Sequence, residues 1–428
     1  MKDVEIIRYG ANGEGIAEKD GKIIFVPYAL LGENVDIDIQ KDNKKFFVGK
    51  ISKINKKSGN RVVPNCPYYE LCGGCDIMHA NLCEQKVIKQ QIVENNLKKY
   101  ANYTGEIKNI ISGEKEFYYR NHITFQVSKD GKLGFFEKES HKFLEIKQCM
   151  LANKKINDCI TMINSYFFDN SIHGFNPKTK TGEVKQVDIK FVNNSLLFTF
   201  VCTTLRLKNL KNLCIRLNCL NVKYGIYLSH NTKNSTIYGE LLHQVGIKQI
   251  ECVDQNIKSE ISPFSFLQIN DEIKDKIYSR ILELVTGKIV FDAYCGRGVL
   301  SCLLSKKANK VIGVEIVESA IIDAQNIAKQ NDIKNVEFVC DDIKNVICSA
   351  GIFDTVILDP PRKGCEKQVL ESITKILPKE IIYLSCSSNT LARDLTQLMN
   401  NYEITFVQPY DMFTQTRHVE TLVYLKKK

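Results

Sequence analysis

The sequence predicts an α/β protein of several domains whose C-terminal part is a doubly wound, Rossmann-like sheet. At roughly 150 residues per domain, the 428 residues correspond to about three domains. The C-terminal part alternates β-branched runs with helical periods, beginning at residues 289–294 and 299–307. The first 58 residues instead consist of short strand-like runs separated by glycine-containing turns. We therefore expect a small β-barrel at 1–58, a central β-rich domain at 59–260 and an α/β domain at 261–428.

The composition excludes a disordered chain, a disulfide scaffold and a membrane protein. Hydrophobic residues make up 44% of the chain and charged residues 25%, which is a globular balance. The charged start at residues 1–5 has no apolar stretch behind it, so we expect a cytoplasmic protein whose 16 cysteines are free thiols or metal ligands. No stretch approaches the ~20 continuous apolar residues that a membrane helix needs.

The N-terminal segment has the pattern of a five-stranded barrel with a basic surface. Strand-like runs cover residues 4–8, 22–26, 34–39 and 46–51. One acid, Asp42, stands among eight basic residues, at positions 41, 44, 45, 50, 53, 56, 57 and 61. A lysine run also suits a solvated sheet edge. On a small barrel, however, unpaired lysines give salt-dependent affinity for a nucleic-acid backbone, so we expect RNA binding.

The middle of the chain divides into a cysteine-rich loop, a helix and a β-rich region. Residues 66–83 are rich in cysteine and glycine. Residues 84–100 predict an amphipathic helix, because apolar side chains recur on one face at positions 87, 88, 92, 93 and 97. Residues from about 115 to 250 read as strands without a chemical motif, and they predict the central β domain.

Acidic residues at the ends of successive C-terminal strands predict a nucleoside cofactor. The sequence Asp-Ala-Tyr-Cys-Gly-Arg-Gly at 292–298 follows the first strand and lacks the full G-x-G-x-x-G spacing of a dinucleotide site. Glu315 ends the second strand, about 20 residues after the first glycine, where a carboxylate suits ribose hydroxyls. Asp342 follows the third strand and Asp359 ends the fourth. The set as a whole favours S-adenosylmethionine.

Cys386 follows the fifth strand, beside the expected methyl donor. A cysteine in a strand is usually a small buried hydrophobe, but a strand end near a helix N-terminus and basic residues should lower the thiol pKa. Addition of a thiolate to carbon 6 of uracil would activate carbon 5 toward the methyl group, and a base must then remove the carbon-5 proton. Glu420 and His418, in the segment 416–421, are the candidate bases, and we favour Glu420.

Motifs spread over the whole chain resemble those of one enzyme family. They are Gly-Glu-Gly at 13–15, the cysteine segment at 66–75, Phe-Leu-Gln-Ile-Asn at 266–270, and the segments 292–298, 359–362, 385–394, 411–413 and 416–421. With these motifs the chain resembles the bacterial RNA uracil-5-methyltransferases, and most closely their 23S ribosomal RNA branch. One departure is Ser387-Ser388 after the cysteine, where many relatives have Asn-Pro, and it affects the shape of that loop.

The resemblance implies a TRAM-type RNA-binding barrel, a central iron–sulfur domain and a methyltransferase domain. It also implies that the helix near 84–100 packs on the catalytic domain, that 23S rRNA is the partner, and that no obligate protein partner is needed. Cys386 would be the nucleophile and Glu420 the general base. The implied cofactor contacts are Gln268, Tyr294, Glu315, Asp342 and Asp359.

Three early cysteines have the spacing of a metal site. Cys66, Cys72 and Cys75 lie on a glycine-rich loop, and this spacing suits a [4Fe–4S] cluster or zinc without separating the two. Cys83 and Cys149 compete as the fourth ligand. The family resemblance implies Cys149 and a [4Fe–4S] cluster. Methyl transfer is a two-electron reaction, so the cluster would be structural or would position RNA.

We therefore expect methylation of carbon 5 of a uridine in 23S rRNA, with S-adenosylmethionine as the methyl donor. A tRNA uracil-5-methyltransferase is one alternative, although that branch usually lacks both the barrel and the cysteine cluster. An amino-methyltransferase would also use Asp-Pro-Pro at 359–361, but it usually has an aromatic residue where Arg362 stands. A third alternative is a non-catalytic iron–sulfur RNA-binding protein.

Overall fold

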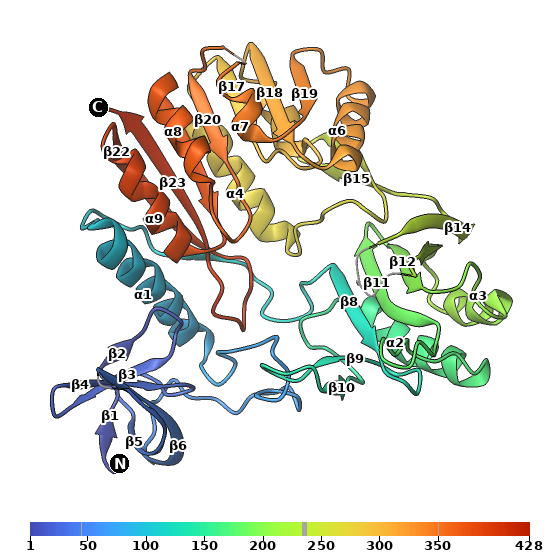
Figure 1. The fold of residues 1–428 in the computed structure, drawn as a ribbon, viewed down its shortest axis with the longest axis horizontal. Coiled ribbons are helices and arrows are strands. Elements are labelled where there is room, and N and C mark those ends of the chain that lie inside the picture. Colours follow the sequence, from blue (N-terminus) through green and yellow to red (C-terminus); the bar gives the residue numbers. More distant parts are fainter. Residues whose placement is uncertain (44, 233–237, 350) are drawn as a thin grey trace.

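The computed structural model describes residues 1–43, 45–232, 238–349 and 351–428. Lys44, one of the basic residues of the N-terminal run, lies outside these ranges. Figure 1 shows an N-terminal barrel in blue, a central sheet in green and a C-terminal α/β domain in orange and red. Within the described ranges, no helix combines the length and apolar composition that crossing a bilayer requires.

The N-terminal barrel is present, with its first strand bent into two. The strand order is β1-β5-β6-β4-β3-β2. Since β1 pairs with β5 and β2 pairs with β3, the short segment 4–9 joins both ends of the sheet and closes it. The strands are β1 (Val4–Glu5), β2 (Arg8–Tyr9), β3 (Gly15–Lys19), β4 (Lys22–Val26), β5 (Asn34–Asp42) and β6 (Phe46–Lys56).

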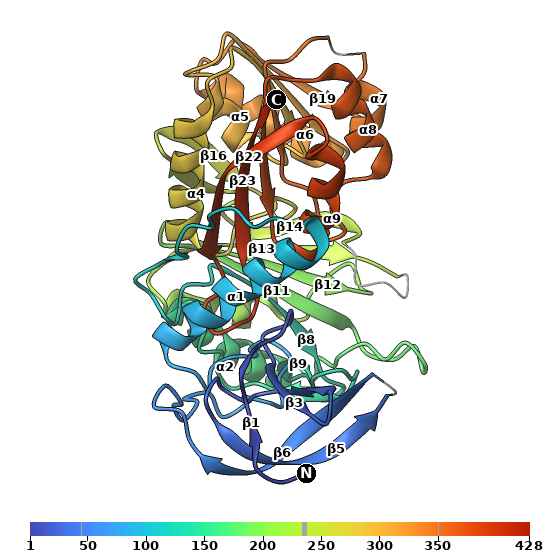
Figure 2. The same ribbon diagram turned by 90° about the vertical axis from the view of Figure 1, so that its left-hand side faces the viewer.

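Helix α1 (Leu82–Ala101) connects the barrel to the C-terminal domain. The Asn81 side chain accepts a hydrogen bond from the Glu84 N–H and caps the helix, and Asn102 ends it in the left-handed conformation. Two faces of α1 are buried. One joins a small cluster with barrel residues, through Ile88 and Ile92, and the other joins the core of the C-terminal domain through residues 93, 97 and 101. Figure 2 shows α1 between the two domains.

The central domain is a seven-stranded sheet, in the order β10-β9-β8-β11-β12-β13-β14, whose core is completed by α2 and α3. Its elements are β8 (His122–Val127), β9 (Leu133–Phe136), β10 (Phe143–Glu145), α2 (Lys154–Asp169), β11 (Val184–Val192), β12 (Ser195–Cys202), α3 (Leu210–Asn218), β13 (Lys223–His230) and β14 (Glu240–Gly246). The hairpin of β15 (Ile250–Asp254) and β16 (Ile257–Ile261) leads to the C-terminal domain.

The predicted doubly wound sheet is confirmed, with the strand order β19-β18-β17-β20-β21-β23-β22-β7. The strands from β19 to β21 are parallel, whereas β23 runs antiparallel to β21. The sequence did not predict β7 (Ile111–Ser112), which adds to the outer edge beside β22. The other strands are β17 (Ile289–Ala293), β18 (Lys310–Glu315), β19 (Val336–Cys340), β20 (Thr355–Leu358), β21 (Glu380–Ser385), β22 (Tyr402–Asp411) and β23 (Glu420–Lys427).

Helices cover both faces of this sheet, because their apolar sides join two separate core clusters. They are α4 (Asp271–Leu284), α5 (Val299–Leu304), α6 (Glu318–Gln330), α7 (Ile343–Val346), α8 (Lys367–Ile376) and α9 (Ser388–Leu398). Strands β18 and β20 lie on opposite sides of β17, so the winding reverses there. Ligands of such sheets bind beyond the carboxyl ends of strands at this reversal.

Candidate active site

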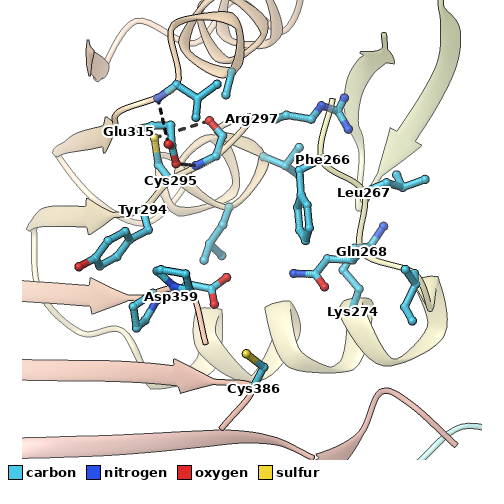
Figure 3. A pocket seen from close by; sticks show the side chains of 18 of the residues that line it. Phe266, Leu267, Gln268, Lys274, Tyr294, Cys295, Arg297, Glu315, Asp359 and Cys386 are labelled. Atoms are coloured by element: carbon cyan, nitrogen blue, oxygen red, sulfur yellow. Dashed lines mark hydrogen bonds between the residues drawn. The ribbon is translucent and has the colours of Figure 1, made fainter. Parts of the chain in front are cut away.

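A large pocket lies at the carboxyl ends of the parallel strands. Its volume is about 1180 Å³, and its walls come from the C-terminal domain, from the segment 250–270 and from the ends of two inner strands of the central sheet, β8 and β11. In Figure 3, Gln268 and Asp359 point into the same space above Cys386. All the side chains expected to act in catalysis or cofactor binding line this one pocket: Gln268, Tyr294, Glu315, Asp342, Asp359, Cys386, His418 and Glu420.

The loop after β17 brings the backbone close to the pocket. Gly296 and Gly298 have φ angles of +53° and +73°, a conformation that glycine adopts without strain. A Cβ atom on Gly298 would lie 2.6 Å from the ring of Phe338, so this position also needs the missing side chain. Tyr294, with φ of +64°, takes the same left-handed conformation despite its side chain. The loop is therefore shaped for a close ligand.

The carboxylate of Glu315 is held in place by this loop and its own strand end. It accepts hydrogen bonds from the backbone N–H groups of Gly296, Ile316 and Val317, at 3.3, 2.9 and 3.0 Å (Figure 3). A carboxylate has about four acceptor positions, so one stays available for a ligand hydroxyl. Asp342 caps α7 and forms an ion pair with Lys344 at 2.8 Å, which lowers the Asp342 pKa.

Two further carboxyl groups, those of Asp292 and Asp359, have pKa values raised to near neutral pH. Burial raises the pKa of Asp292 to about 7, although Ser301 donates a hydrogen bond to it at 2.5 Å. Burial also raises the pKa of Asp359 to about 7, and the nearby Asp292 carboxylate adds to this shift. Carboxyl groups with such raised pKa values cluster at functional sites.

Strand register sets Cys386 opposite Glu420. In the antiparallel pair β21–β23, Ser385 lies opposite Thr421. Continuing that register by one residue brings Cys386, the first residue after β21, opposite Glu420, the first residue of β23. The carboxyl of Glu420 is buried, with 7% of its surface exposed. A thiol and a carboxyl group thus face the same end of the pocket from neighbouring strands.

The expectation of a lowered thiol pKa at Cys386 is wrong. Burial raises the pKa of this thiol to about 11, and the carboxylates of Glu420 and Asp359 add to the shift, whereas Arg362 opposes it. The sequence analysis placed Glu420 and Asp359 in the site but did not take into account how strongly burial and these carboxylates oppose a thiolate. Burial also raises the pKa of Glu420 to about 8, with Asp359 adding to the shift and Arg362 opposing it. Burial and Arg362 lower the pKa of His418 to about 4, so this imidazole is neutral.

The two serines after Cys386 shape the start of α9. The Ser387 side chain accepts a hydrogen bond from the Thr390 N–H and caps the helix. The Ser388 hydroxyl accepts a hydrogen bond from the Asn96 side-chain amide of α1 at 2.8 Å. The departure from Asn-Pro therefore leaves a capped helix that is tied to α1.

The four cysteines expected to bind a cluster line a second cavity of about 410 Å³. Cys66, Cys72, Cys75 and Cys149 come together there, and each thiolate of the first three would be repelled by Cys149. Cys83, the competing ligand, is exposed on α1. Among the described residues, no group of three or more His, Cys, Asp and Glu side chains has the geometry to hold a metal ion. His122 and Ile269 line both this cavity and the large pocket.

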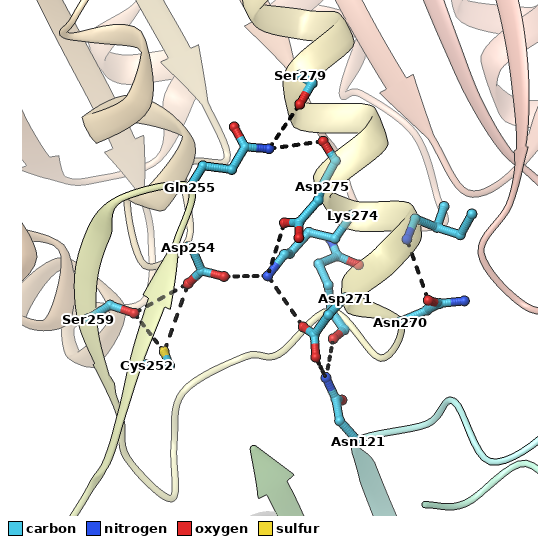
Figure 4. Close-up of polar contacts among 12 residues, drawn as sticks. Asn121, Cys252, Asp254, Gln255, Ser259, Asn270, Asp271, Lys274, Asp275 and Ser279 are labelled. Carbon is cyan, nitrogen blue, oxygen red and sulfur yellow. Dashed lines mark hydrogen bonds and ion pairs between the residues drawn. The ribbon is translucent and has the colours of Figure 1, made fainter. Parts of the chain in front are cut away.

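The sequence did not indicate several other residues that line the large pocket. Phe266 leaves 71% of its surface exposed there. Lys274 of α4 contacts the carboxylates of Asp254, Asp271 and Asp275 (Figure 4). Asp254 lies in the β15–β16 hairpin, 20 positions earlier in the chain, so only the folded structure reveals this ion cluster.

Comparison with known families identifies the fold and the class of reaction. A family model described as tRNA (Uracil-5-)-methyltransferase matches residues 83–345, which is more than half of the chain. A methyltransferase domain matches residues 284–425, and a TRAM domain matches residues 2–51. The chain belongs to the RNA uracil-5-methyltransferase family. It is an S-adenosylmethionine-dependent RNA methyltransferase with an N-terminal TRAM domain.

Relatives of this family match the chain over its whole length. An uncharacterized RNA methyltransferase of Clostridium acetobutylicum is 36% identical over 99% of this chain and 96% of its own. An uncharacterized RNA methyltransferase of Staphylococcus epidermidis is 31% identical over 100% of this chain and 98% of its own. The crystal structure of Pyrococcus abyssi tRNA (uracil-54, C5)-methyltransferase in complex with S-adenosyl-L-homocysteine has a TM-score of 0.81, with 27% identity, and covers 99% of this chain and 100% of that one.

The electrostatics of the pocket predict how Cys386 reacts with an alkylating reagent. Because the thiol pKa is about 11, alkylation by iodoacetamide should be slow at pH 8 and should accelerate up to about pH 11. Glu420→Gln removes the carboxylate with the larger effect on this thiol, so it should lower the thiol pKa and accelerate the reaction at pH 9, about tenfold for each unit of pKa. Peptide mass spectrometry measures the modified fraction at this position.

Glu403→Gln is the matched control. It removes the same charge from an exposed position on the neighbouring strand β22. An equal acceleration in both variants would contradict the assigned electrostatics.

Proposed function

We propose that this chain transfers a methyl group from S-adenosylmethionine to carbon 5 of a uridine in 23S rRNA. The strand register that brings the thiol of Cys386 and the carboxyl of Glu420 to the same end of the cofactor pocket carries this proposal. A nucleophile and a base are both needed, because carbon 5 of uracil is weakly nucleophilic and loses a proton in the reaction.

Cys386 supplies the electrons that make carbon 5 reactive. Its thiolate bonds to carbon 6 of the uracil, and the electron pair of the 5,6 double bond moves into an enolate. Bound S-adenosylmethionine supplies an electrophilic methyl group, which carbon 5 takes while S-adenosylhomocysteine leaves. Arg362, which favours the thiolate electrostatically, counteracts burial and the neighbouring carboxylates.

Glu420 completes the reaction as the base. Its carboxylate removes the proton of carbon 5, the electron pair restores the double bond, and the sulfur of Cys386 leaves as a thiolate. A pKa of about 8 is close to the working pH, which suits a general base. His418 is less suited, because its pKa of about 4 makes it a weak base.

The remaining pocket residues bind the cofactor and the uracil in this proposal. Glu315 takes the ribose hydroxyls, since its carboxylate is already oriented by backbone N–H groups. The remaining contacts to the cofactor and to the uracil come from other residues that line the pocket, namely Gln268, Tyr294, Asp342 and Asp359. The uridine must leave its stack to reach Cys386, and the exposed ring of Phe266 offers it a stacking surface.

Two RNA substrates have support. The barrel with its lysines and the cysteine segment resemble the 23S rRNA branch, which favours ribosomal RNA. The full-length likeness to the archaeal tRNA (uracil-54, C5)-methyltransferase favours tRNA as the second candidate.

The donor set of the cysteine cavity suits a [4Fe–4S] cluster, which the family resemblance implies. Four thiolates can hold zinc as well, so the ligand type alone does not separate the two. A cavity of about 410 Å³ with four thiols in its walls leaves room for a larger group held by cysteine thiolates. Cys66, Cys72, Cys75 and Cys149 would hold this cluster, which has a structural role.

Substitutions should separate the nucleophile from the base. Cys386→Ala should abolish methyl transfer, because the enolate no longer forms, and should keep the affinity for S-adenosylhomocysteine measured by calorimetry. Glu420→Gln should instead trap a covalent RNA–protein adduct, seen as a shifted band in a denaturing gel, because the carbon-5 proton stays in place. Normal turnover by the alanine variant would refute the assigned nucleophile.

The substrate is tested with labelled cofactor and unmodified RNA. We expect the wild-type chain to transfer labelled methyl groups to 23S rRNA and to leave tRNA transcripts unlabelled, with 5-methyluridine as the product in nucleoside analysis. Label in tRNA alone would establish the second candidate. Binding of both RNAs without any label would favour the non-catalytic alternative, and a label on an exocyclic amine would favour the amino-methyltransferase.

Anaerobic purification tests the cluster. The wild-type chain should contain about four iron atoms per chain and absorb visible light. Cys149→Ala should lower the iron content, because it removes a cavity thiol, whereas Cys83→Ala should not, because that thiol is exposed on α1. Neither iron nor a chromophore in the wild-type chain would remove the cluster from the proposal.

A further inference from the structure

The loop between β22 and β23 forms one wall of the active pocket. We call residues 412–419 the base loop, because Glu420 follows it directly. Phe413 and His418 of this loop line the pocket, and their rings pack edge to face with 6.0 Å between the ring centroids. The path of the base loop therefore decides where the Glu420 carboxyl and two pocket walls lie.

Gln415, in the middle of the base loop, has a strained backbone. Its φ angle is +74°, in the left-handed region that side chains other than glycine rarely adopt. Only 2% of its surface is exposed. Such a conformation persists only where the surroundings determine it, and it occurs preferentially at functional sites.

Gln85 of α1 holds Gln415 with a pair of hydrogen bonds. The Gln85 side-chain N–H donates to the side-chain carbonyl of Gln415 at 2.9 Å, and the Gln415 backbone N–H donates to the side-chain carbonyl of Gln85 at 3.0 Å. Both residues are buried, with Gln85 1% exposed. The two lie 330 positions apart in the chain, so this contact joins helix α1 to the base loop of the catalytic domain.

The cysteine loop and a buried lysine hold the same segment. The backbone N–H groups of Asp76 and Ile77, next to Cys75, donate to the Gln415 carbonyl at 3.2 and 3.3 Å. Lys89 of α1 is fully buried, forms an ion pair with Asp411 and donates to the Phe413 carbonyl at 3.0 Å. The Tyr119 hydroxyl donates to the Thr414 carbonyl at 2.9 Å. Every one of these donors lies outside the catalytic sheet.

From this geometry we propose that Gln85 and Gln415 are positioning residues for the general base: their amide pair keeps the base loop in its strained path and so keeps Glu420 opposite Cys386. The inference rests on the proposed role of Glu420. It adds that a helix and a cysteine loop outside the catalytic sheet determine the base geometry. Without the amide pair, only the backbone contacts of the Asp76 and Ile77 N–H groups still hold Gln415. The strained φ is then less well supported, and the strand end that carries Glu420 shifts as the strain is partly released.

Gln85→Leu tests the proposal, because it nearly keeps the side-chain volume and removes both hydrogen bonds to Gln415. It also removes the hydrogen bond that the Gln85 side chain donates to the Ala80 carbonyl at 2.9 Å, at the start of α1. A displacement of a reacting group by about 1 Å costs up to ~100-fold in rate. We expect kcat for RNA methylation to fall roughly 10- to 100-fold, with the KM for RNA and the affinity for S-adenosylhomocysteine unchanged. The covalent RNA adduct should accumulate, because the base step is the one that slows.

A second readout does not depend on RNA chemistry. The Glu420 carboxylate contributes to the high pKa of the Cys386 thiol. Asp359 and Arg362 are the other charged groups that act on it, and both lie outside the base loop. If Glu420 moves away in Gln85→Leu, alkylation of Cys386 at pH 9 should accelerate toward the rate seen in Glu420→Gln.

Gln408→Leu is the matched control. Gln408 is a buried glutamine of β22 whose side chain donates to the carbonyls of Asn109 and Pro409, away from the pocket. It should lose a comparable amount of thermal stability and keep the alkylation rate and kcat of the wild-type chain.

Variants at Gln415 guard against misfolding of Gln85→Leu. Gln415→Gly and Gln415→Ala lose the same amide, but glycine adopts positive φ without strain. We expect the glycine variant to stay within about threefold of the wild-type kcat, and the alanine variant to be several times slower. If the wild-type chain is active and Gln85→Leu keeps both its kcat and its alkylation rate, the inference is wrong. Equal rates in the glycine and alanine variants would also overturn it. Absence of methylation in the wild-type chain would instead overturn the proposed function.

Discussion

The active pocket depends on the antiparallel pairing of β23 with β21, the last of five parallel strands. Parallel strands end at a common edge, so any residue that follows β17, β18, β20 or β21 reaches the cofactor space. Only a strand that runs the other way can begin at that edge. Because β23 does so beside β21, a residue at the start of one strand faces a residue after the end of the other, without any long loop between them.

The cost of this arrangement is a group of carboxyl groups that share a buried space. Asp292, Asp359 and Glu420 all have raised pKa values because burial penalises their charged forms. A carboxyl group with a raised pKa in the folded state binds protons that the unfolded chain has released. Its burial therefore destabilises the fold progressively as pH rises through the unfolded and then the folded pKa. A cationic sulfonium group would instead attract these carboxyl groups in their ionised form and lower their pKa values.

Sequence reasoning was most successful where the information is local. The alternation of strands and helices predicted the doubly wound sheet, and the ends of those strands supplied the pocket residues, since a parallel sheet collects its strand ends. It failed on the Cys386 pKa because burial, the largest cause of the raised value, depends on how the whole pocket packs, and the residues around the cysteine do not indicate it. It missed β7, Gln85 and Lys274 for a similar reason: each acts through a partner that only the fold brings close. The choice between Cys83 and Cys149 required the same information, because spacing says nothing of which thiol faces the cavity.

Helix α1 has a mechanical consequence for RNA recognition. A helix of 20 residues is about 30 Å long and resists bending. Its side chains are buried in the barrel-side cluster toward one end and in the catalytic core toward the other, so the barrel cannot swing on a flexible tether. The spacing between the lysine-bearing surface and the reactive sulfur is then a constant of the molecule. If Cys386 acts as proposed, a substrate RNA must present its backbone to the barrel and an unstacked uridine to the pocket at this separation, so the folded shape of the RNA would contribute to its selection.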